Sequence, residues 1–356
     1  MSVFRQGESG SIMNINVLVL GVGGNVSQGI MTALRLSGTP VKIIGACVSE
    51  ESLGLYFCDK AYISPYADSP EFISWYVDLC IKEKIDITFS GVEEIVEVLE
   101  RNREVLKGLK TVFVSSSLEC LNIGNDKYLT CKWLEDNSLN FPLCASSDDN
   151  GEIDKLISRV EYPLIAKPRR GKGSAGIIRI DNEKELSLVP RDNYVIQECL
   201  GSADNEYTVG CYVNKRGVLD DMIVFKRYLR YGTTFKAEIV HDAEIIEECT
   251  RICSAFHPVG PLNIQMRKHK GKPVCFELNV RFSGTTAMRA RWGFNDVAAM
   301  LNEYILGRPT NLHPHDSGIA YRYFNEAYIN PMMKSRLTEA GYVQDVSAFS
   351  NFKEVF

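Results

Sequence analysis

A predicted β-hairpin over residues 263–281 constrains the fold of this chain more than any other segment. Its two strands are joined by a turn at residues 268–273, and the side chains of a β-strand alternate between its two faces. Glu277 and Asn279 therefore point to one side of the second strand. The turn sets Gln265 of the first strand opposite Glu277. Three oxygen-bearing side chains are thus expected to converge on one face of the hairpin.

This set of side chains suits a divalent cation. Carboxylate and amide oxygens are hard ligands, and Mg²⁺ prefers one or two carboxylates plus substrate phosphates to a full cage of protein ligands. Arg281 continues the same face of the second strand, where it can meet negative charge that develops on a transferred phosphoryl group. The alternative is an amphipathic hairpin whose polar face is merely solvated.

The first part of the chain predicts an α/β domain over residues 14–115. An apolar strand at residues 16–20 runs into a glycine-rich turn and then into a helix. Strands that alternate with helices predict a parallel sheet covered on both faces. Further strands are expected at residues 42–48, 61–63, 85–89 and 111–114, and helices at residues 71–83 and 93–106.

The rest of the chain predicts two lobes and a tail. A small lobe is expected at residues 116–192, and a larger lobe at residues 193–312 whose strands fit an antiparallel sheet best. No role is assigned to residues 313–356. The expected helices lie at residues 126–137, 152–160, 242–256 and 296–304, and the strands of the small lobe lie at residues 163–167 and 177–180.

Two glycine-rich loops are candidates to bind a phosphate group. The first, at residues 21–26, lies between a strand and a helix, as in a dinucleotide-binding fingerprint, but Val26 occupies the third glycine position. The acidic residue expected after the second strand is also missing, since residues 46–48 are Ala, Cys and Val. An NAD(P)-linked oxidoreductase is therefore disfavoured. A tight turn that lets the backbone approach an anion or a substrate is the preferred interpretation.

The second loop, at residues 167–176, combines glycines with positive charge. It differs from a Walker A loop because Ala166 fills the first glycine position and a strand follows in place of a helix. A mobile hairpin of this composition can close over a polyphosphate, since backbone N–H groups and lysines bind its oxygens. The alternative is a solvated basic hairpin tip. A separate apolar strand at residues 195–200 carries Glu198, and Glu206 follows eight residues later. Both carboxylates are candidates to line a nucleoside pocket.

The order of these motifs, with Asp126 and Lys127 ahead of them, resembles the ATP-grasp superfamily, and most closely the ATP-grasp halves of the carbamoyl-phosphate synthetase large subunit. The resemblance covers residues 14–312, and its most specific part is an N-x-Q and E-x-N-x-R pattern at residues 263–265 and 277–281. It implies an α/β and α+β architecture, in which a Rossmann-like, parallel-sheet pre-ATP-grasp domain precedes an ATP-grasp fold.

The resemblance also implies roles on the phosphate side of the site. Lys127 and Lys167 would contact ATP phosphates, and Arg281 together with Lys167 would serve catalysis by stabilising the transferred phosphoryl group. The metal ligands would be Gln265, Glu277 and Asn279. The lid loop would comprise Arg169, Gly171, Lys172, Gly173, Ser174 and Gly176.

On the nucleoside side, Glu198 and Leu200 would line the adenine pocket, and Glu206 would hold the ribose. The spacing to Glu206 is one residue longer than in carbamoyl-phosphate synthetases, which leaves Asp204 as an alternative ribose ligand. Those synthetases also carry a further arginine where this chain has Gly284, and they contain two ATP-grasp units. The missing arginine argues against a bicarbonate-phosphorylating role, and the single ATP-grasp unit of this chain argues against a complete carbamoyl-phosphate pathway within it.

The activity implied by the resemblance is that of an ADP-forming carboxylate–amine ligase, which uses ATP with Mg²⁺ or Mn²⁺. Its partners would be a small carboxylic acid and an amine or similar nucleophile. Candidate clamps for the acid are Arg289 and Arg291, for which surface arginines on a helix are the alternative, and a second set at Lys226, Arg227 and Arg230. A noncatalytic nucleotide-binding protein and, less favoured, the oxidoreductase are the competing hypotheses.

Composition excludes several other classes of protein. The formal net charge of −5 and the short basic clusters disfavour nucleic acid as a partner. Apolar runs are too short for a membrane helix, so a cytoplasmic protein is expected, with a homodimer as the commonest assembly. The 11 cysteines lack the paired spacing of a zinc site, so we expect them to be small apolar residues of the core. Cys249 and Cys253, four residues apart, are expected to be packed thiols on one helix face.

Overall fold

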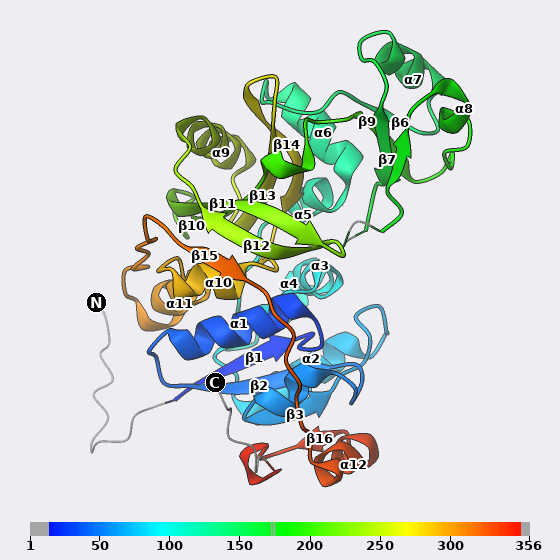
Figure 1. Ribbon diagram of the computed structural model, residues 1–356. Coiled ribbons are helices and arrows are strands. Elements are labelled where there is room, and N and C mark those ends of the chain that lie inside the picture. Colours follow the sequence, from blue (N-terminus) through cyan, green and yellow to red (C-terminus); the bar gives the residue numbers. More distant parts are fainter. Residues whose placement is uncertain (1–13, 172, 174, 350–356) are drawn as a thin grey trace.

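The computed structural model describes residues 14–171, 173 and 175–349, which form three β-sheets. The first sheet has the strand order β16-β3-β2-β1-β4-β5 and lies at the bottom of Figure 1. Its parallel strands are apolar runs such as β1, because both faces are covered by helices and by the chain that follows. The strands are β1 Ile15–Leu20, β2 Val41–Cys47, β3 Lys60–Ile63, β4 Ile87–Ser90 and β5 Val112–Phe113.

The helices of this first part alternate with its strands, as the sequence predicts. They are α1 Asn25–Leu36, η1 Leu53–Phe57, α2 Phe72–Glu83, α3 Glu93–Arg101 and α4 Arg103–Leu106. The single helix expected over residues 93–106 is wrong in one respect, because the chain breaks it at Asn102. The side chain of Asn102 donates a hydrogen bond to the carbonyl of Val98 at 2.8 Å, so it competes with the backbone for a helical acceptor.

The second sheet belongs to the small lobe at the upper right of Figure 1 and has the antiparallel order β6-β9-β7-β8. Its core is formed by Leu164, Ala166, Ile180 and Ile196, which pack with residues of α7. The strands are β6 Cys144–Ser146, β7 Leu164–Pro168, β8 Ile178–Ile180 and β9 Tyr194–Glu198. The helices around it are α5 Leu118–Asn125, α6 Lys127–Asp136, α7 Asn150–Ile157 and α8 Glu183–Leu186.

The third sheet is antiparallel, with the order β14-β13-β10-β11-β12-β15. One face packs on α9 through buried side chains that include Val209, Cys211, Cys249 and Ile264. The other face meets α1, α10 and α11 at its lower end, where Phe225 and Ile30 share one core cluster. Its elements are η2 Ala203–Asn205, β10 Glu206–Val213, β11 Leu219–Arg230, β12 Thr233–Ile239, α9 Ala243–Phe256, β13 Gly260–His269, β14 Lys272–Asn279, α10 Thr286–Arg291, α11 Asp296–Met300 and the π-helical turn η3 Leu301–Leu306.

The C-terminal segment, residues 313–349, joins two of the sheets. Its first strand, β15 Ile319–Tyr321, pairs with β12 of the third sheet. The chain then crosses the front of the molecule to α12 Pro331–Ala340, and β16 Tyr342–Val343 pairs with β3 of the first sheet before the short helix η4 Ser347–Phe349 (Figure 1). The segment to which the sequence assigns no role therefore supplies an edge strand to each of two sheets.

None of the 11 cysteines, all of which lie in the described residues, forms a disulfide, and nine are buried. Cys249 and Cys253 are both buried in the core beneath α9, in agreement with the prediction of packed thiols. No helix in the described part of the chain combines the length and apolar character needed to cross a membrane.

Candidate active site

The predicted hairpin is present with the predicted register. Gln265 of β13 lies opposite Glu277 of β14, and Asn263 lies opposite Asn279. Gln265 and Asn279 both donate to Oε1 of Glu277, over 3.4 Å and 3.1 Å, so the three side chains do converge on one carboxylate. Their convergence follows from strand alternation and from the turn between the strands.

A bulge in the hairpin adds a residue that strand alternation does not predict. The register shifts between Gln265 and Met266, so β14 has one more residue than β13 at this point. As a result, Phe276 and its neighbour Glu277 both line the same cavity, although consecutive strand residues normally face opposite sides. The sequence carries no clear signal for this bulge.

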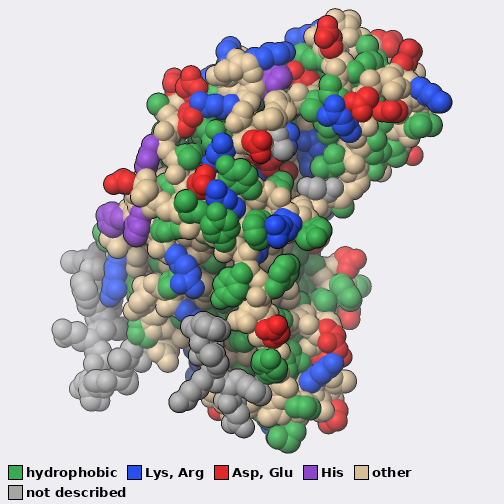
Figure 2. Space-filling view, in the orientation of Figure 1, with side chains coloured by type: hydrophobic (Ala, Val, Ile, Leu, Met, Phe, Trp, Pro, Cys, Tyr) green, Lys and Arg blue, Asp and Glu red, His purple; other side chains and the backbone are tan. Residues whose placement is uncertain are grey.

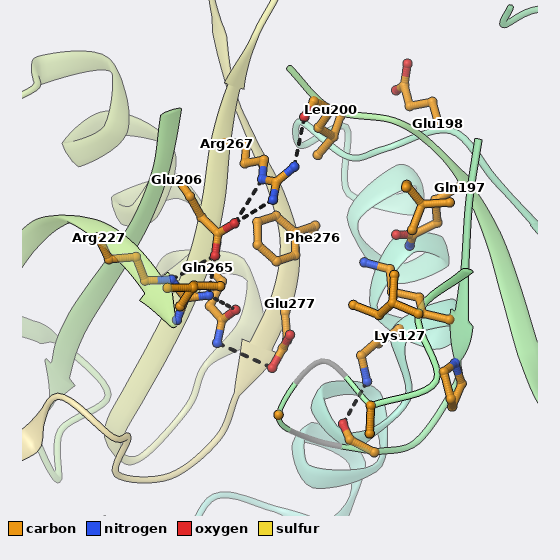
Figure 3. A pocket seen from close by; sticks show the side chains of 18 residues that line it. Lys127, Gln197, Glu198, Leu200, Glu206, Arg227, Gln265, Arg267, Phe276 and Glu277 are labelled. Carbon is orange, nitrogen blue, oxygen red and sulfur yellow. Dashed lines mark hydrogen bonds and ion pairs between the residues drawn. The ribbon is translucent and has the colours of Figure 1, made fainter. Parts of the chain in front are cut away.

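The cavity has a volume of about 190 Å³ and lies between the third sheet and the small lobe. Figure 3 shows its two walls, with Glu206, Gln265 and Glu277 on one side and Gln197 and Lys127 on the other. In the space-filling view, the surface is hollowed on the right-hand side between the small lobe and the α/β domain below it (Figure 2). Predicted site residues that line the cavity are Lys127, Lys167, Gly171, Gly173, Glu198, Leu200, Glu206, Gln265 and Glu277.

Two lysines supply positive charge opposite the hairpin. Lys127 begins α6, and its Nζ donates to the carbonyl of Gly171 at 2.9 Å. Lys167 lies on β7, and its Nζ is 5.1 Å from the centre of the Phe276 ring. Burial lowers the pKa of Lys167, because a cation loses hydration there, while Glu277 acts in the opposite direction. Both ammonium groups are placed to meet an anionic ligand.

The predicted lid loop connects β7 to β8, but its first arginine has a structural role. Arg169 forms an ion pair with Asp126, the N-cap of α6, with 2.8 Å between Nη2 and Oδ2. The backbone N–H of Lys127 also donates to the carbonyl of Arg169 at 2.9 Å. The base of the lid is thereby fixed to the start of α6. Lys172 and Ser174 lie outside the described residues.

The glycines of the lid permit close backbone contacts. Gly173 lies against Gly232, which sits between β11 and β12 with φ +71°, and a Cβ on Gly232 would be only 2.1 Å from the carbonyl oxygen of Gly173. Gly176, with φ +72°, packs against the side chains of Pro168 and Tyr194, since a Cβ added to it would lie 2.9 Å from Cγ of Pro168 and 3.1 Å from the hydroxyl of Tyr194. The lid therefore rests directly on the third sheet's β11–β12 turn.

At the far end of the cavity, Glu198 is the last residue of β9 and Leu200 follows the strand. Oε1 of Glu198 accepts a hydrogen bond from the backbone N–H of Leu143 at 3.0 Å, and the carbonyl of Leu200 accepts one from Arg267 at 3.1 Å. Leu200 is buried. This wall offers backbone groups and apolar surface, which suit a flat heterocycle.

Glu206 is buried between two arginines that take both of its oxygens. Arg227 Nε donates to Oε1 at 2.8 Å, and Arg267 Nη2 donates to Oε2 at 2.7 Å. Arg227 also donates to Oε1 of Gln265 at 2.6 Å. Sequence reasoning missed Arg267, although its position two residues after Gln265 places it on the same strand face. Asp204, the alternative ribose ligand, is exposed in η2.

Arg281 and Asn279 lie beside the cavity and do not line it in the described part of the chain. Arg281 Nε donates to Oε1 of Glu93 at 3.0 Å, and its Nη2 donates to Oδ1 of Asn279 at 3.2 Å. Arg281 therefore connects the β13–β14 hairpin, through Asn279, to helix α3 of the first domain, through Glu93.

Arg289 fits neither interpretation that the sequence suggests. Its side chain is buried, so it is no surface arginine, and its Nη2 donates to Asp296 at 2.7 Å and to Thr286 at 3.0 Å. With its charge taken by Asp296, this guanidinium is not available to clamp a substrate. Arg291, at the end of α10, is exposed.

The first glycine-rich loop forms a tight turn. Gly21 has φ +70° and lies against Val92, and Gln28 donates to the carbonyls of Val22 and Gly23 over 3.1 Å and 3.2 Å. A Cβ on Gly54 would lie 2.0 Å from the carbonyl oxygen of Val22, so η1 closes over the turn.

The donor set of the hairpin fits a magnesium ion that shares its coordination with a ligand. Gln265, Glu277 and Asn279 offer one carboxylate and two amide groups. Among the described residues, no group of three or more His, Cys, Asp or Glu side chains could hold a metal ion. A cation at this place would therefore need oxygens from a bound phosphate.

Two parts of the chain match models of known protein families. Residues 124–285 match the model of the ATP-grasp domain, and residues 17–114 match the model of the PylC-like N-terminal domain. A curated relative, the carbamoyl phosphate synthase large chain of Methanocorpusculum labreanum, is 21% identical over 329 residues, which cover 82% of this chain. The chain spans about a third of the length of that relative, since the match covers 30% of it.

Solved structures share the fold at low identity. An N5-carboxyaminoimidazole synthetase from Staphylococcus aureus complexed with ADP has a TM-score of 0.67 and 16% identity, over 90% of this chain and 85% of that one. An L-amino acid ligase from Bacillus licheniformis has a TM-score of 0.65 and 16% identity, over 89% and 82% of the two chains. These matches confirm the predicted ATP-grasp fold with an N-terminal parallel-sheet domain.

Proposed function

Because this chain contains an ATP-grasp domain behind a PylC-like N-terminal domain, we propose that it is an ATP-dependent ligase. It joins a small carboxylic acid to an amine or a similar nucleophile and releases ADP and phosphate. One observation carries the proposal: Gln265 and Glu277 face Lys127 and Lys167 across a single cavity that a glycine-rich lid borders.

The cavity has a place for each part of ATP. The triphosphate lies between the two lysines and the hairpin, under Gly171 and Gly173 of the lid. The adenine lies near Leu200, where the backbone after β9 can read its edge. Glu206 fixes Arg227 and Arg267 in position at this end of the cavity. Because both oxygens of Glu206 are already engaged by these arginines, Asp204 is the preferred candidate to bind the ribose hydroxyls.

Gln265, Glu277 and Asn279 would hold Mg²⁺, or Mn²⁺ in its place. A metal ion bound there would neutralise negative charge on the phosphates as they react. The set contains a single carboxylate, which agrees with this role. Several carboxylates around the cation would repel the negatively charged triphosphate, whereas one leaves coordination positions for its oxygens.

The proposed reaction has two steps. A carboxylate oxygen of the acid attacks the γ-phosphorus, an O–P bond forms, and the bond to the β-bridging oxygen breaks so that ADP leaves. The amine nitrogen then attacks the acyl carbon, phosphate departs with the electron pair of the C–O bond, and the amine loses a proton to solvent. The acylphosphate must be kept from water, which is the task of the lid.

The side chains act by position and charge. Lys127 and Lys167 hold the phosphates, and Arg281 lies next to Asn279, where it can stabilise charge on the transferred group. No nucleophilic side chain is required. The shared fold with an L-amino acid ligase supports an amino acid as one class of substrate to test first.

The test is release of ADP and phosphate from Mg²⁺-ATP in the presence of pooled amino acids, small carboxylic acids and amines. We expect release that depends on one acid, together with a product whose mass equals acid plus amine minus water. Resolving the active pool into single compounds names the substrates. ATP binding without release for any pool would contradict a ligase and would favour a noncatalytic nucleotide-binding protein.

A further inference from the structure

Arg322 lies on the cavity face of the third sheet, although it comes from the C-terminal segment. Strand β15 pairs with β12 so that Ala320 is opposite Ala237, and Ala237 is opposite Arg227 of β11. Arg322 follows Ala320 by two residues and continues that face, with its backbone N–H bonded to the carbonyl of Phe235 at 2.7 Å. Arg227 of the same face contacts Gln265 of the hairpin.

The charge of Arg322 has no counterpart in the described part of the chain. Its Nη2 donates to the carbonyl of Gly284 at 2.6 Å, and no carboxylate of the described residues forms an ion pair with it. The side chain is half-buried, and burial alone lowers its pKa, as expected where no acid offsets the lost hydration. No N–H group of Arg322 is both buried and without a partner among the described residues, so those that form no hydrogen bond are open to solvent and can be reached by an anion.

Arg322 reaches the loop that follows Arg281, the residue proposed to act on the transferred phosphoryl group. Gly284 lies three residues after Arg281, in the loop between the hairpin and α10. On its other side, a Cβ on Gly284 would be 3.4 Å from Nδ2 of Asn25, which begins α1 of the PylC-like domain. Three parts of the chain thus meet at Gly284, and Arg322 brings the positive charge.

We propose that Arg322 binds the carboxylate of the acid substrate beside the loop that follows Arg281. The inference rests on the proposed ligase function and adds to it the residue that recognises the acid. A guanidinium can bind a carboxylate through two parallel N–H···O bonds, and one Nη2 bond to Gly284 fixes the plane of the group while other N–H groups stay free. Arg289, which the sequence suggests for this task, is already paired with Asp296.

The test compares Arg322→Gln and Arg322→Lys with Arg308→Gln, an exposed arginine after η3 to which no role in the site is assigned and which serves as the matched control. The assay is ADP release with the single acid identified from the pools, with acid and ATP varied in turn. We expect Arg322→Gln to raise KM for the acid about 10- to 100-fold, the usual effect of a lost charged hydrogen bond. KM for ATP and the melting temperature should match those of Arg308→Gln.

Arg322→Lys keeps the charge and loses the planar fork, so its KM for the acid should lie between those of wild type and Arg322→Gln. An unchanged KM for the acid in Arg322→Gln, or an equal rise in both KM values, would overturn the inference while the ligase function stands. Failure of the ligase function shows itself separately, because the wild-type protein would then release no ADP with any pool.

Discussion

Arg281, two residues after strand β14, forms an ion pair with Glu93, the first residue of α3 in the N-terminal domain. The contact spans 188 positions of sequence and sets the orientation of a side chain that also touches Asn279. The N-terminal domain therefore helps to position a residue proposed to act in phosphoryl transfer.

Changing Arg281 should slow the chemical step more than it weakens ATP binding. We expect Arg281→Gln to lower kcat about 100- to 1,000-fold, the range seen when a preorganised donor to a developing negative charge is lost. Glu93→Gln keeps the shape of the partner and should lower kcat by less than about 10-fold, because Arg281 retains its bond to Asn279. Steady-state ADP release measures both, and full activity in Arg281→Gln would refute the assigned role.

Glu277→Gln tests the metal site. The substitution removes the carboxylate on which Gln265 and Asn279 converge and leaves the shape of the side chain. We expect kcat to fall at least about 100-fold and the Mg²⁺ concentration for half-maximal activity to rise, with an unchanged circular dichroism spectrum. Glu339→Gln, at an exposed position of α12, is the control. Wild-type turnover in Glu277→Gln would exclude this carboxylate as a metal ligand.

The lowered pKa of Lys167 predicts an alkaline limb in the pH profile. Lysine is charged below its pKa, so a pKa depressed by burial means that this ammonium loses its proton at a lower pH than a solvated lysine does. We expect kcat/KM for ATP to fall as the pH rises through that value, while kcat, which reports the ATP-bound enzyme, falls later. Lys167→Arg should remove the limb, since arginine stays protonated. An identical limb in Lys167→Arg would assign it to another group.

The contact between Gly173 and Gly232 can be tested with a matched pair of substitutions. Gly232→Ala would place a Cβ 2.1 Å from the lid carbonyl, whereas Gly217→Ala has the same type of backbone, with φ +74°, and nothing within 4 Å. Both should lose roughly 1 kcal/mol of stability from the left-handed backbone. Only Gly232→Ala should lower kcat/KM for ATP, by about 10- to 100-fold, because the lid is displaced. Equal kinetics in the two variants would show that the contact does not matter for closure.

The buried pair of Arg289 and Asp296 should matter for stability and not for substrate recognition. Asp296→Asn leaves a buried guanidinium without its counter-charge, which typically costs about 3–5 kcal/mol of unfolding free energy. Replacing both residues, with Arg289→Met and Asp296→Leu, should restore most of that loss. Urea unfolding gives the free energies. A double variant as unstable as Asp296→Asn would show that the polar contacts to Thr286 matter more than the charge pair.

The sequence predicts well those features that depend on local periodicity. Alternation along the hairpin places Gln265, Glu277 and Asn279 together, and the strand–helix order of residues 14–115 yields the parallel sheet. Such patterns contain no information on which distant segments meet. The pairing of Arg281 with Glu93 and the approach of Arg322 to Gly284 arise only in the folded chain.

Other features of the site could not be predicted from the sequence, because they also depend on contacts outside the local pattern. The bulge that turns Phe276 into the cavity breaks the period of two, and the burial of Arg289 depends on helices that follow the hairpin. The two arginines around Glu206 also change the expected role of that carboxylate. Charged side chains predict a surface by default, so a fully buried ion pair is recognised only when its partner is known.

Strands β15 and β16 place the last described part of the chain in two different sheets, while the sheet of the small lobe draws its strands from residues 144–198 alone. For recombination with a relative, the natural exchangeable module is therefore discontinuous. A chimera that replaces the N-terminal domain needs α12 and β16 from the same parent, because β16 pairs with β3, whereas β15 belongs with the third sheet, because it pairs with β12. The small lobe, in contrast, can be exchanged as a continuous cassette.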